Sequence, residues 1–260
     1  MPPFFLNAFV FCLGAIIGSF LNVCIYRMPR RESIIRPRSH CPQCKAAIAW
    51  YDNIPFLSYL FLKGRCRHCK SGISPRYFVV ESLSAGMFLF FWQHFGLSSF
   101  FFIYSALGAS LIVVSFIDIA IQEIPDEISL PGIVIGLILS LGFPQLHLSL
   151  SPGAGLWNSA LGLLAGGGAI YITGLLGNAV FKKESMGGGD VKLMAMIGAF
   201  IGWKLALLTF FLAPFFGAAV GIVIKIREGK SLIPYGPFLS LACFISIVWG
   251  QRIINWLFYP

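Results

Sequence analysis

The chain has 260 residues, of which 57% are hydrophobic and 11% are charged, and its formal net charge is +9. Soluble domains carry roughly 25% charged residues, so this composition excludes an ordinary soluble protein and predicts a polytopic membrane protein. The positive charge does not indicate nucleic acid as a partner, because 11 of the 19 Lys and Arg lie between Arg27 and Arg76, beside apolar segments. Basic residues clustered in this way set membrane topology and attract anionic lipid.

The first apolar segment, residues 4–26, has no charged region before it and no clear cleavage site after it. We interpret it as a retained transmembrane helix and not as a signal peptide. A span needs about 20 apolar residues, and seven further candidates follow: 77–95, 98–117, 128–146, 157–181, 191–203, 205–225 and 234–257. The sequence therefore predicts an all-α polytopic membrane protein with about eight transmembrane helices, although 191–225 could also form one broken span. Residues 1–26 would be the first helix, 27–76 a cytoplasmic insert and 77–260 the main membrane domain.

The insert contains two CxxC pairs, Cys41 with Cys44 and Cys66 with Cys69, separated by 21 residues. This spacing is close to that of a tetrahedral four-thiolate zinc site, in which each pair supplies two sulfurs from one tight turn. The insert is too small to build its own core, so a structural Zn2+ ion would hold it together. Two disulfides or two redox pairs are the alternative, but a cytoplasmic loop is kept reduced.

The distribution of charge also predicts an orientation. If the insert is cytoplasmic, alternation of the spans places the loops 118–127, 182–190 and 226–233 on the same side. The last two loops contain Lys182, Lys183, Arg227 and Lys230, with Lys192 and Lys225 at their borders, whereas only Lys204 and Arg252 fall on the outer side. The loops 96–97 and 147–156 on the other side contain no Lys or Arg. This is a positive-inside pattern, and it places the N-terminus outside the cytoplasm.

Two aspartates are expected at the cytoplasmic border. Asp118 ends the third candidate span, and Asp190 follows Gly187, Gly188 and Gly189 at the start of the sixth. Ionisable groups at membrane depth are costly and are functional candidates. Two carboxyl groups that meet can share a proton, so that one activates water while the other protonates a carbonyl. Because glycines let a substrate strand approach the backbone, the pattern indicates an aspartyl protease site at the water–lipid boundary.

Other interpretations of the acidic residues remain open. Asp190 could cap a helix, Asp118 could mark a helix end, and Asp126 precedes a span and has the pattern of an N-cap. Glu81 lies inside the second candidate span and needs a polar partner or water; it could also support the site. An ion or proton transporter would use membrane-buried aspartates too. A zinc-clipped structural subunit of a secretion machine is a third possibility.

The ordered motifs resemble those of the bacterial type IV prepilin peptidases, the GxGD-type membrane aspartyl peptidases of pilus, type II secretion and competence systems. The similar segments are GSFLNVCIYRMPR, the four-cysteine loop, IDIAIQEIPDEISLP and MGGGDVKLMAMIGAFIGW, and the resemblance covers nearly the whole chain. The GxGD form is also shared with presenilin-like intramembrane proteases. Two departures are Phe78, where that family commonly has proline, and Lys45, where it commonly has glycine after CxxC.

The resemblance implies that Asp118 and Asp190 form the catalytic pair of a membrane aspartyl peptidase domain over 77–260, in the bacterial inner membrane. It implies cleavage of prepilin or pseudopilin leaders after a glycine at the cytoplasmic face. It also implies N-methylation of the new N-terminus by S-adenosylmethionine, although no Rossmann-type glycine fingerprint is present.

The expected substrates carry a basic leader and an apolar helix. Three acidic residues of the loop near the predicted site, Glu123, Asp126 and Glu127, are expected to attract the leader. Anionic lipids are expected to bind the basic insert at 27–76.

Overall fold

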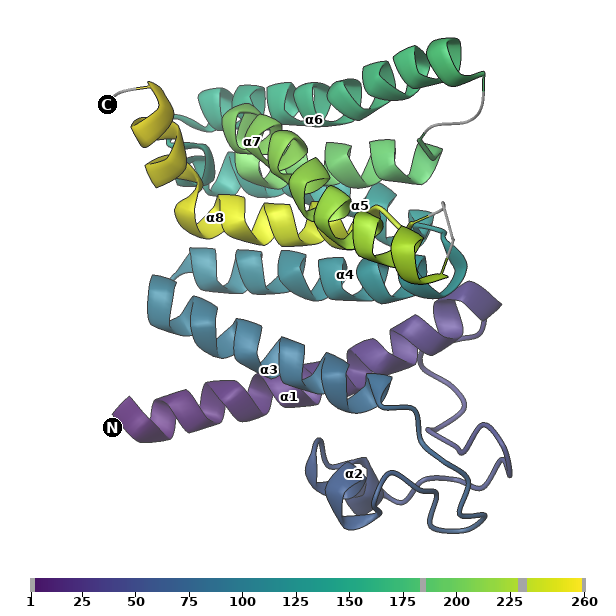
Figure 1. Ribbon diagram of the computed structural model, residues 1–260. Coiled ribbons are helices and arrows are strands. Elements are labelled where there is room, and N and C mark those ends of the chain that lie inside the picture. The colour runs from purple at the N-terminus through teal and green to yellow at the C-terminus, as the bar shows by residue number, and fades with distance from the viewer. Residues whose placement is uncertain (1–2, 183–185, 229–232, 259–260) are drawn as a thin grey trace. The chain divides into compact units, whose positions relative to one another are not determined.

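The computed structural model describes residues 3–182, 186–228 and 233–258, and its long elements in these ranges are α-helices (Figure 1). The chain divides into two compact units, 1–113 and 114–260, which are described separately. The long helices are α1 (Pro3–Arg27), α3 (Arg76–Phe95), α4 (Ser99–Ile121), α5 (Asp126–Gly142), α6 (Pro152–Phe181), α7 (Gly188–Glu228) and α8 (Gly236–Phe258). The short elements are η1 (Met28–Arg30), η2 (Trp50–Asn53), α2 (Leu57–Phe61) and η3 (Pro144–His147).

Five helices of the described part are long and apolar enough to cross a membrane. They are Phe4–Arg30, Ser99–Ile121, Pro152–Val180, Gly188–Val223 and Gly236–Phe258. The expectation of about eight spans is therefore not confirmed. The α5 helix has only 17 residues, with Pro131 inside it, and the charged Arg76 and Glu81 lower the apolarity of α3.

The candidate spans 191–203 and 205–225 belong to one element, α7, which is interrupted at Gly202. Gly202 has φ 76° and ψ 170°, a left-handed conformation that glycine adopts at no steric cost. The interruption divides α7 into a first arm, 188–201, and a second arm, 203–228. Figure 1 shows the helix changing direction between these arms.

In the first unit, α1 and α3 pack antiparallel through small residues. The missing side chains of Gly14 and Gly18 allow the backbone of α3 to approach at Ala85 and Glu81. The Ser84 hydroxyl donates a 2.7 Å hydrogen bond to the Gly14 carbonyl across this interface. Small residues and interhelical hydrogen bonds are the usual means of helix association in a membrane, where apolar burial supplies little driving force.

In the second unit, the first arm of α7 lies between α6 and α5. Gly162 of α6 and Gly198 of α7 meet backbone to backbone, and the Ser159 hydroxyl donates a 2.6 Å hydrogen bond to the Ala199 carbonyl. On α5, Gly132 lies against Met196 and Gly136 lies against Ala199. The register of these contacts makes α6 antiparallel and α5 parallel to the first arm.

The remaining contacts of the second unit fix which helix ends lie together. The Ser115 hydroxyl of α4 donates to Ser240 of α8 at 2.9 Å, and Thr209 of the second arm donates to Ser246 of α8 at 2.9 Å. Gly236 also contacts Asp118 and Phe238 contacts Gly217, so α8 runs antiparallel to α4 and to the second arm. The loop after α4 packs against the start of α7, where Ile124 lies beside Gly189, and Lys192 pairs with Asp126 at the start of α5. The end of α4 and the starts of α5, α7 and α8 therefore share one end of this unit.

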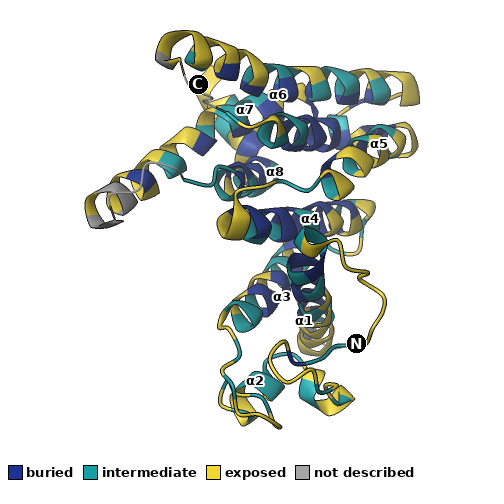
Figure 2. Cartoon of the chain, turned by 90° about the vertical axis from the view of Figure 1, so that its right-hand side faces the viewer, coloured by how far each residue is buried: buried dark blue, intermediate teal, exposed yellow. Residues whose placement is uncertain are grey.

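The outer surfaces of the helices are apolar. On α6, the large side chains of Trp157, Leu164, Tyr171 and Leu175 are all exposed, and much of this helix is coloured as exposed in Figure 2. Such continuous apolar surface is rare on a soluble monomer. Together with the five apolar helices, it indicates that the chain is an integral membrane protein.

Candidate active site

Asp118 lies in the last turn of α4, at the shared end of the second unit. The residue is 5% exposed, and its Oδ2 atom accepts a 2.7 Å hydrogen bond from the backbone N–H of Gly236, the first residue of α8. A Cβ atom on Gly236 would lie only 2.8 Å from this oxygen. Glycine at position 236 therefore allows the start of α8 to donate directly to the carboxylate.

Asp190 lies in the first turn of α7, at the same end of the unit. Its backbone N–H donates a 3.1 Å hydrogen bond to the Gly187 carbonyl, and the residue is half-buried. The Asp118 carboxylate is close enough for its charge to act on the Asp190 carboxyl group. The structure thus brings together the two aspartates that the sequence singles out.

The three glycines before Asp190 have different surroundings. A Cβ on Gly188 would meet nothing within 4 Å, and a Cβ on Gly187 would have the Asp190 Oδ2 atom 3.5 Å away as its nearest neighbour. Both residues are exposed. A Cβ on Gly189 would instead lie 2.9 Å from the Ile124 Cβ. Gly189 thus lets the loop after α4 pack against α7, while Gly187 and Gly188 leave bare backbone beside Asp190.

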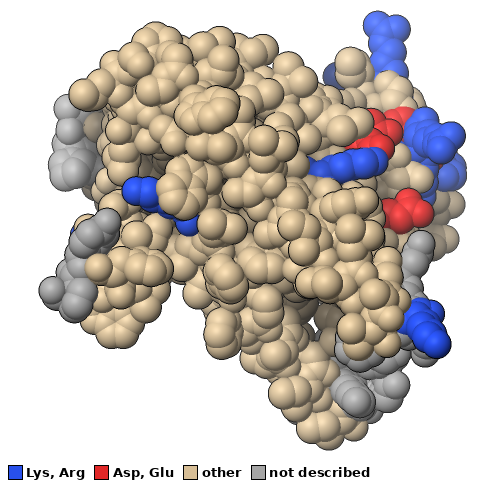
Figure 3. Space-filling view, turned by 90° about the horizontal axis from the view of Figure 1, so that it is seen from above, with Lys and Arg blue, Asp and Glu red and all other residues tan. Residues whose placement is uncertain are grey.

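The acidic loop near this site is partly neutralised. The Lys192 ammonium lies 2.8 Å from both carboxylate oxygens of Asp126, and this pair joins the start of α5 to the start of α7. Asp126 is the first residue of α5 and Pro125 is the N-cap, so the expectation of an Asp126 N-cap is wrong by one position. Glu123 and Glu127 are exposed. Figure 3 shows acidic side chains beside basic ones on an otherwise mostly uncharged face.

Glu81 has a partner inside the first unit. Its Oε2 atom accepts a 3.0 Å hydrogen bond from the backbone N–H of Phe56, a residue of the insert with φ 60°. Glu81 is buried, at 8% exposed. This contact holds the insert on α3 and explains how a buried carboxylate is tolerated there.

The four cysteines of the insert converge as their spacing predicts. Their sulfur atoms all lie within 4.8 Å of one another, with Cys41 and Cys69 at 3.8 Å and Cys44 and Cys66 at 4.0 Å. These separations are far too long for disulfides, whose sulfurs are about 2.05 Å apart. Tetrahedral Zn2+ with bonds of about 2.3 Å requires sulfurs about 3.8 Å apart, so the donor set fits a closed structural zinc site.

The two turns that carry the cysteines have the same backbone design. Cys41 N–H donates to the Ala46 carbonyl and Lys45 N–H to the Cys41 carbonyl; Cys66 and Lys70 repeat both bonds, with Ser71 in the place of Ala46. The Ser71 hydroxyl lies 3.0 Å from the Cys69 sulfur, and hydrogen bonding from it lowers the pKa of the Cys69 thiol to about 6. A thiolate is the form that binds metal.

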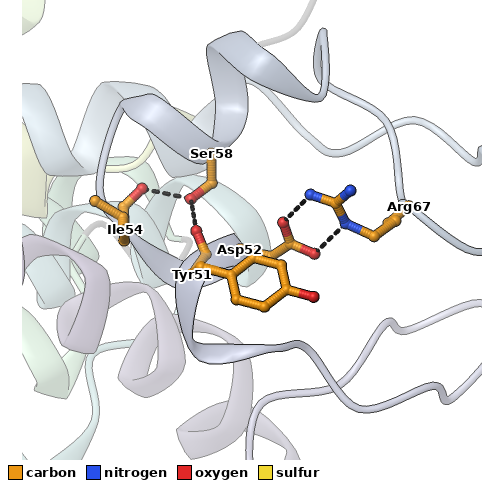
Figure 4. A network of polar contacts seen from close by, with 5 residues as sticks. All are labelled: Tyr51, Asp52, Ile54, Ser58 and Arg67. Carbon is orange, nitrogen blue, oxygen red and sulfur yellow. Dashed lines mark hydrogen bonds and ion pairs between the residues drawn. The ribbon is translucent and has the colours of Figure 1, made fainter.

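An ion pair connects the second turn to the rest of the insert (Figure 4). The Arg67 guanidinium, between Cys66 and His68, donates two hydrogen bonds of 2.6 and 2.7 Å to the Asp52 carboxylate of η2. This pairing lowers the pKa of the Asp52 carboxyl group, chiefly through the hydrogen bonds. The Ser58 hydroxyl closes the neighbouring turn by donating a 2.6 Å hydrogen bond to the Ile54 carbonyl, with the Tyr51 carbonyl 3.3 Å away as a second acceptor.

Sequence reasoning did not find two residues at this site, Gly236 and Tyr235. The Tyr235 hydroxyl is buried and has no hydrogen-bond partner among the described residues. The charge of Asp190 reaches this phenol, and burial together with that charge raises the pKa of Tyr235 to about 12. The only signal that the sequence offered was a Tyr-Gly-Pro tripeptide near the start of the last apolar segment.

Comparison with known proteins decides among the remaining interpretations. Residues 105–222 match the model of the type IV leader peptidase family, and residues 12–95 match the bacterial peptidase A24 N-terminal domain. The chain belongs to the type IV leader peptidase family. It is therefore an enzyme, a peptidase of this family, and nothing supports the transporter alternative.

Several curated relatives match over nearly their whole length. Proteins named prepilin leader peptidase/N-methyltransferase are 35% identical in Stutzerimonas stutzeri and 34% identical in Pseudomonas aeruginosa, each over 95% of this chain and 92% of the relative. The protein of that name from Legionella pneumophila is 34% identical over 98% of this chain and 95% of the relative. No solved structure matches the chain.

Proposed function

We propose that the chain is a membrane aspartyl endopeptidase that cleaves the leader from type IV prepilins or pseudopilins after a glycine. The observation that carries this proposal is the placement of Asp118 and Asp190 at one end of the second unit, where the charge of Asp118 reaches the Asp190 carboxyl group. Each comes from a terminal turn of a different apolar helix, so the pair would lie at the membrane–water interface.

In the proposed reaction, the two carboxyl groups share one proton, because two charges at close range are costly in an apolar setting. The ionised group removes a proton from water, whose oxygen bonds to the scissile carbonyl carbon. The protonated group gives its proton to the carbonyl oxygen. The C–N bond then breaks as the nitrogen takes the proton that the first carboxyl group removed from water. A hydroxyl of the intermediate returns its proton to the other carboxyl group, which leaves a new carboxyl group on the product and a free amine. The pair titrates as a unit.

The substrate is proposed to reach this pair along exposed backbone. Gly187 and Gly188 offer bare, accessible peptide groups next to Asp190, and an unwound strand of the prepilin would lie against them. The apolar helix of the prepilin would pack among the helices from the lipid side.

The basic leader is proposed to meet the loop that joins α4 to α5. Because Lys192 already pairs with Asp126, the free negative charge of this loop resides on the exposed Glu123 and Glu127. Replacing both glutamates by lysine is expected to slow cleavage, with an effect that shrinks as salt rises. A substrate whose leader lysines are changed to glutamate should recover part of the loss. Equal rates with either leader would refute this recognition.

The orientation is proposed from charge. The shared end of the second unit and the insert would face the cytoplasm of the bacterial inner membrane, with the N-terminus outside. If each arm of α7 crosses separately and α3 and α5 cross as well, eight spans result. Lys183, Glu184 and Lys230 of the expected cytoplasmic loops lie outside the described residues. The basic insert would bind anionic lipids.

The second proposed activity is N-methylation of the new N-terminus, for which S-adenosylmethionine would supply the methyl group. The described residues form no strand–loop–helix of the kind that holds nucleotides elsewhere, so no side chain is assigned to the methyl donor. Zn2+ on Cys41, Cys44, Cys66 and Cys69 would act as a structural clip of the insert.

A synthetic prepilin incubated with the purified chain in lipid tests the proposal, with mass spectrometry reporting both cleavage and an added methyl group. Asp118→Asn and Asp190→Asn should each slow cleavage by about 10²–10⁴-fold. Both variants should still methylate a pilin that already has a free N-terminus. Glu32→Gln, at an exposed position of the insert, is the matched control. Full cleavage by either aspartate variant would falsify the proposed site.

A further inference from the structure

Tyr235 is fixed in place directly beside the aspartate pair. Its carbonyl accepts hydrogen bonds from the N–H groups of Phe238 at 3.1 Å and Leu239 at 3.2 Å, which tie the residue to the first turn of α8. The next residue, Gly236, donates its N–H to Asp118. The peptide group that joins Tyr235 to Gly236 thus contacts the Asp118 carboxylate directly.

The hydroxyl of Tyr235 has surroundings that suggest a role in the reaction. The oxygen is buried, yet none of the described residues bonds to it. Burying a hydroxyl without a partner costs about 1–3 kcal/mol, so such a group calls for an explanation, and beside two carboxyl groups a catalytic role is one. The phenol, which is protonated at neutral pH in any case, also lies within reach of the Asp190 charge, and burial together with that charge raises the pKa of Tyr235 to about 12.

We propose that Tyr235 is a further catalytic residue, whose hydroxyl donates a hydrogen bond to the oxygen of the scissile carbonyl as water adds to it. This inference rests on the proposed peptidase function. The substrate supplies the acceptor that the hydroxyl lacks in the free protein. The phenol keeps its proton throughout, so the proton transfers by Asp118 and Asp190 are unchanged.

The physical reason is the change in charge on that oxygen during the reaction. The carbonyl oxygen becomes more negative as the new C–O bond forms, so a donor aimed at it binds the transition state more tightly than the substrate. Removing one such donor from other hydrolases lowers kcat by about 10²–10³-fold. Tyr235 and Gly236 would then serve the site from one turn, with a side-chain donor for the substrate and a backbone donor for Asp118.

Tyr235→Phe tests the proposal, because it removes the hydroxyl and keeps the ring. With the synthetic prepilin, kcat is expected to fall about 10²-fold, while KM changes by less than about threefold. Tyr171→Phe is the matched control, since Tyr171 is exposed on the outer face of α6. Unchanged kcat in Tyr235→Phe, or a rise in KM alone, would overturn the inference.

A transition-state mimic separates this role from a structural one. A prepilin peptide with a hydrated difluoroketone at the scissile position carries two hydroxyl groups on the reacting carbon. Tyr235→Phe should bind this peptide about 10²-fold more weakly, and should bind an uncleavable ground-state peptide as the unchanged chain does. Equal losses for both peptides would indicate a general packing defect and would overturn the catalytic role.

Measuring the two aspartate variants in the same assay distinguishes a failure of the Tyr235 inference from a failure of the proposed peptidase site. If Asp118→Asn and Asp190→Asn abolish cleavage while Tyr235→Phe keeps its full kcat, only the Tyr235 inference fails. If the aspartate variants cleave normally, the peptidase site itself is wrong, and the Tyr235 inference fails with it.

Discussion

The backbone N–H of Gly236 donates a 2.7 Å hydrogen bond to Oδ2 of Asp118, and this bond joins the start of the last helix to the end of α4. The partner is a peptide group at a helix start, where N–H groups have no intrahelical acceptor. The bond therefore satisfies one of these donors and orients one carboxylate of the pair.

Gly236→Ala should disturb this arrangement. The new Cβ would lie 2.8 Å from Asp118 Oδ2 and 3.4 Å from its Cβ and Cγ atoms, so the carboxylate must move. We expect cleavage to fall at least about tenfold, because small misplacements of reacting groups are costly. Gly168→Ala, where nothing lies within 4 Å, should cleave normally. Normal cleavage by Gly236→Ala would show that the bond does not orient Asp118 for catalysis.

Gly162→Ala should loosen the contact between α6 and the first arm of α7. A Cβ at this position would overlap the carbonyl oxygen of Gly198 and approach Gly202 within 2.9 Å, and backbone atoms cannot yield easily. Overpacking of this kind costs about 1–3 kcal/mol. Denaturant unfolding in detergent should report the loss, again with Gly168→Ala as reference. Equal midpoints for the two variants would contradict the close packing.

Lys45→Gly and Lys70→Gly should stabilise the insert. Both lysines follow a CxxC pair and have φ 59°, a left-handed conformation that costs a side-chain-bearing residue roughly 1–2 kcal/mol. Glycine relieves this strain, so the variants should hold Zn2+ longer against a chelator. Gln43→Gly, within the first turn but not at a positive φ, should not gain. Faster metal loss from both lysine variants would show that their side chains, not their backbone, matter.

His147 predicts a pH dependence at the other end of the second unit. Both ring nitrogens are buried without a partner among the described residues, next to the interruption at Gly202, and burial lowers the pKa of His147 to about 4. The unfolded chain takes up a proton near pH 6.5, whereas the folded chain stays neutral until about pH 4. Stability should therefore fall as the pH drops through this window and stay level above it.

The measurement compares the chain with His147→Gln, which cannot titrate. On going from pH 7.5 to pH 5, the unfolding midpoint of the unchanged chain should fall relative to that of His147→Gln. A difference that stays constant over this range would mean that His147 is protonated equally in both states.

Local sequence patterns predicted much of the arrangement of the cysteine cluster and of the two aspartates. The spacing of Cys41, Cys44, Cys66 and Cys69 predicted their convergence because each pair acts within one tight turn, and the sulfur positions confirm it. Hydropathy and the alternation of basic loops placed Asp118 and Asp190 at one end, which requires only that apolar helices follow one another across the same membrane. That these aspartates are catalytic stays a prediction.

The tertiary structure alone decided the rest. The sequence left open whether 191–225 forms one broken span or two, and it did not place the break at Gly202. It also did not show that the Glu81 carboxylate accepts a hydrogen bond from the Phe56 N–H, or that Tyr235 and Gly236 adjoin the aspartates. Each of these depends on backbone groups that meet across helices distant in the sequence, or on a dihedral angle set by packing. Hydropathy and spacing report how single segments prefer to fold, and they carry no information about which peptide group faces which carboxylate once the helices pack.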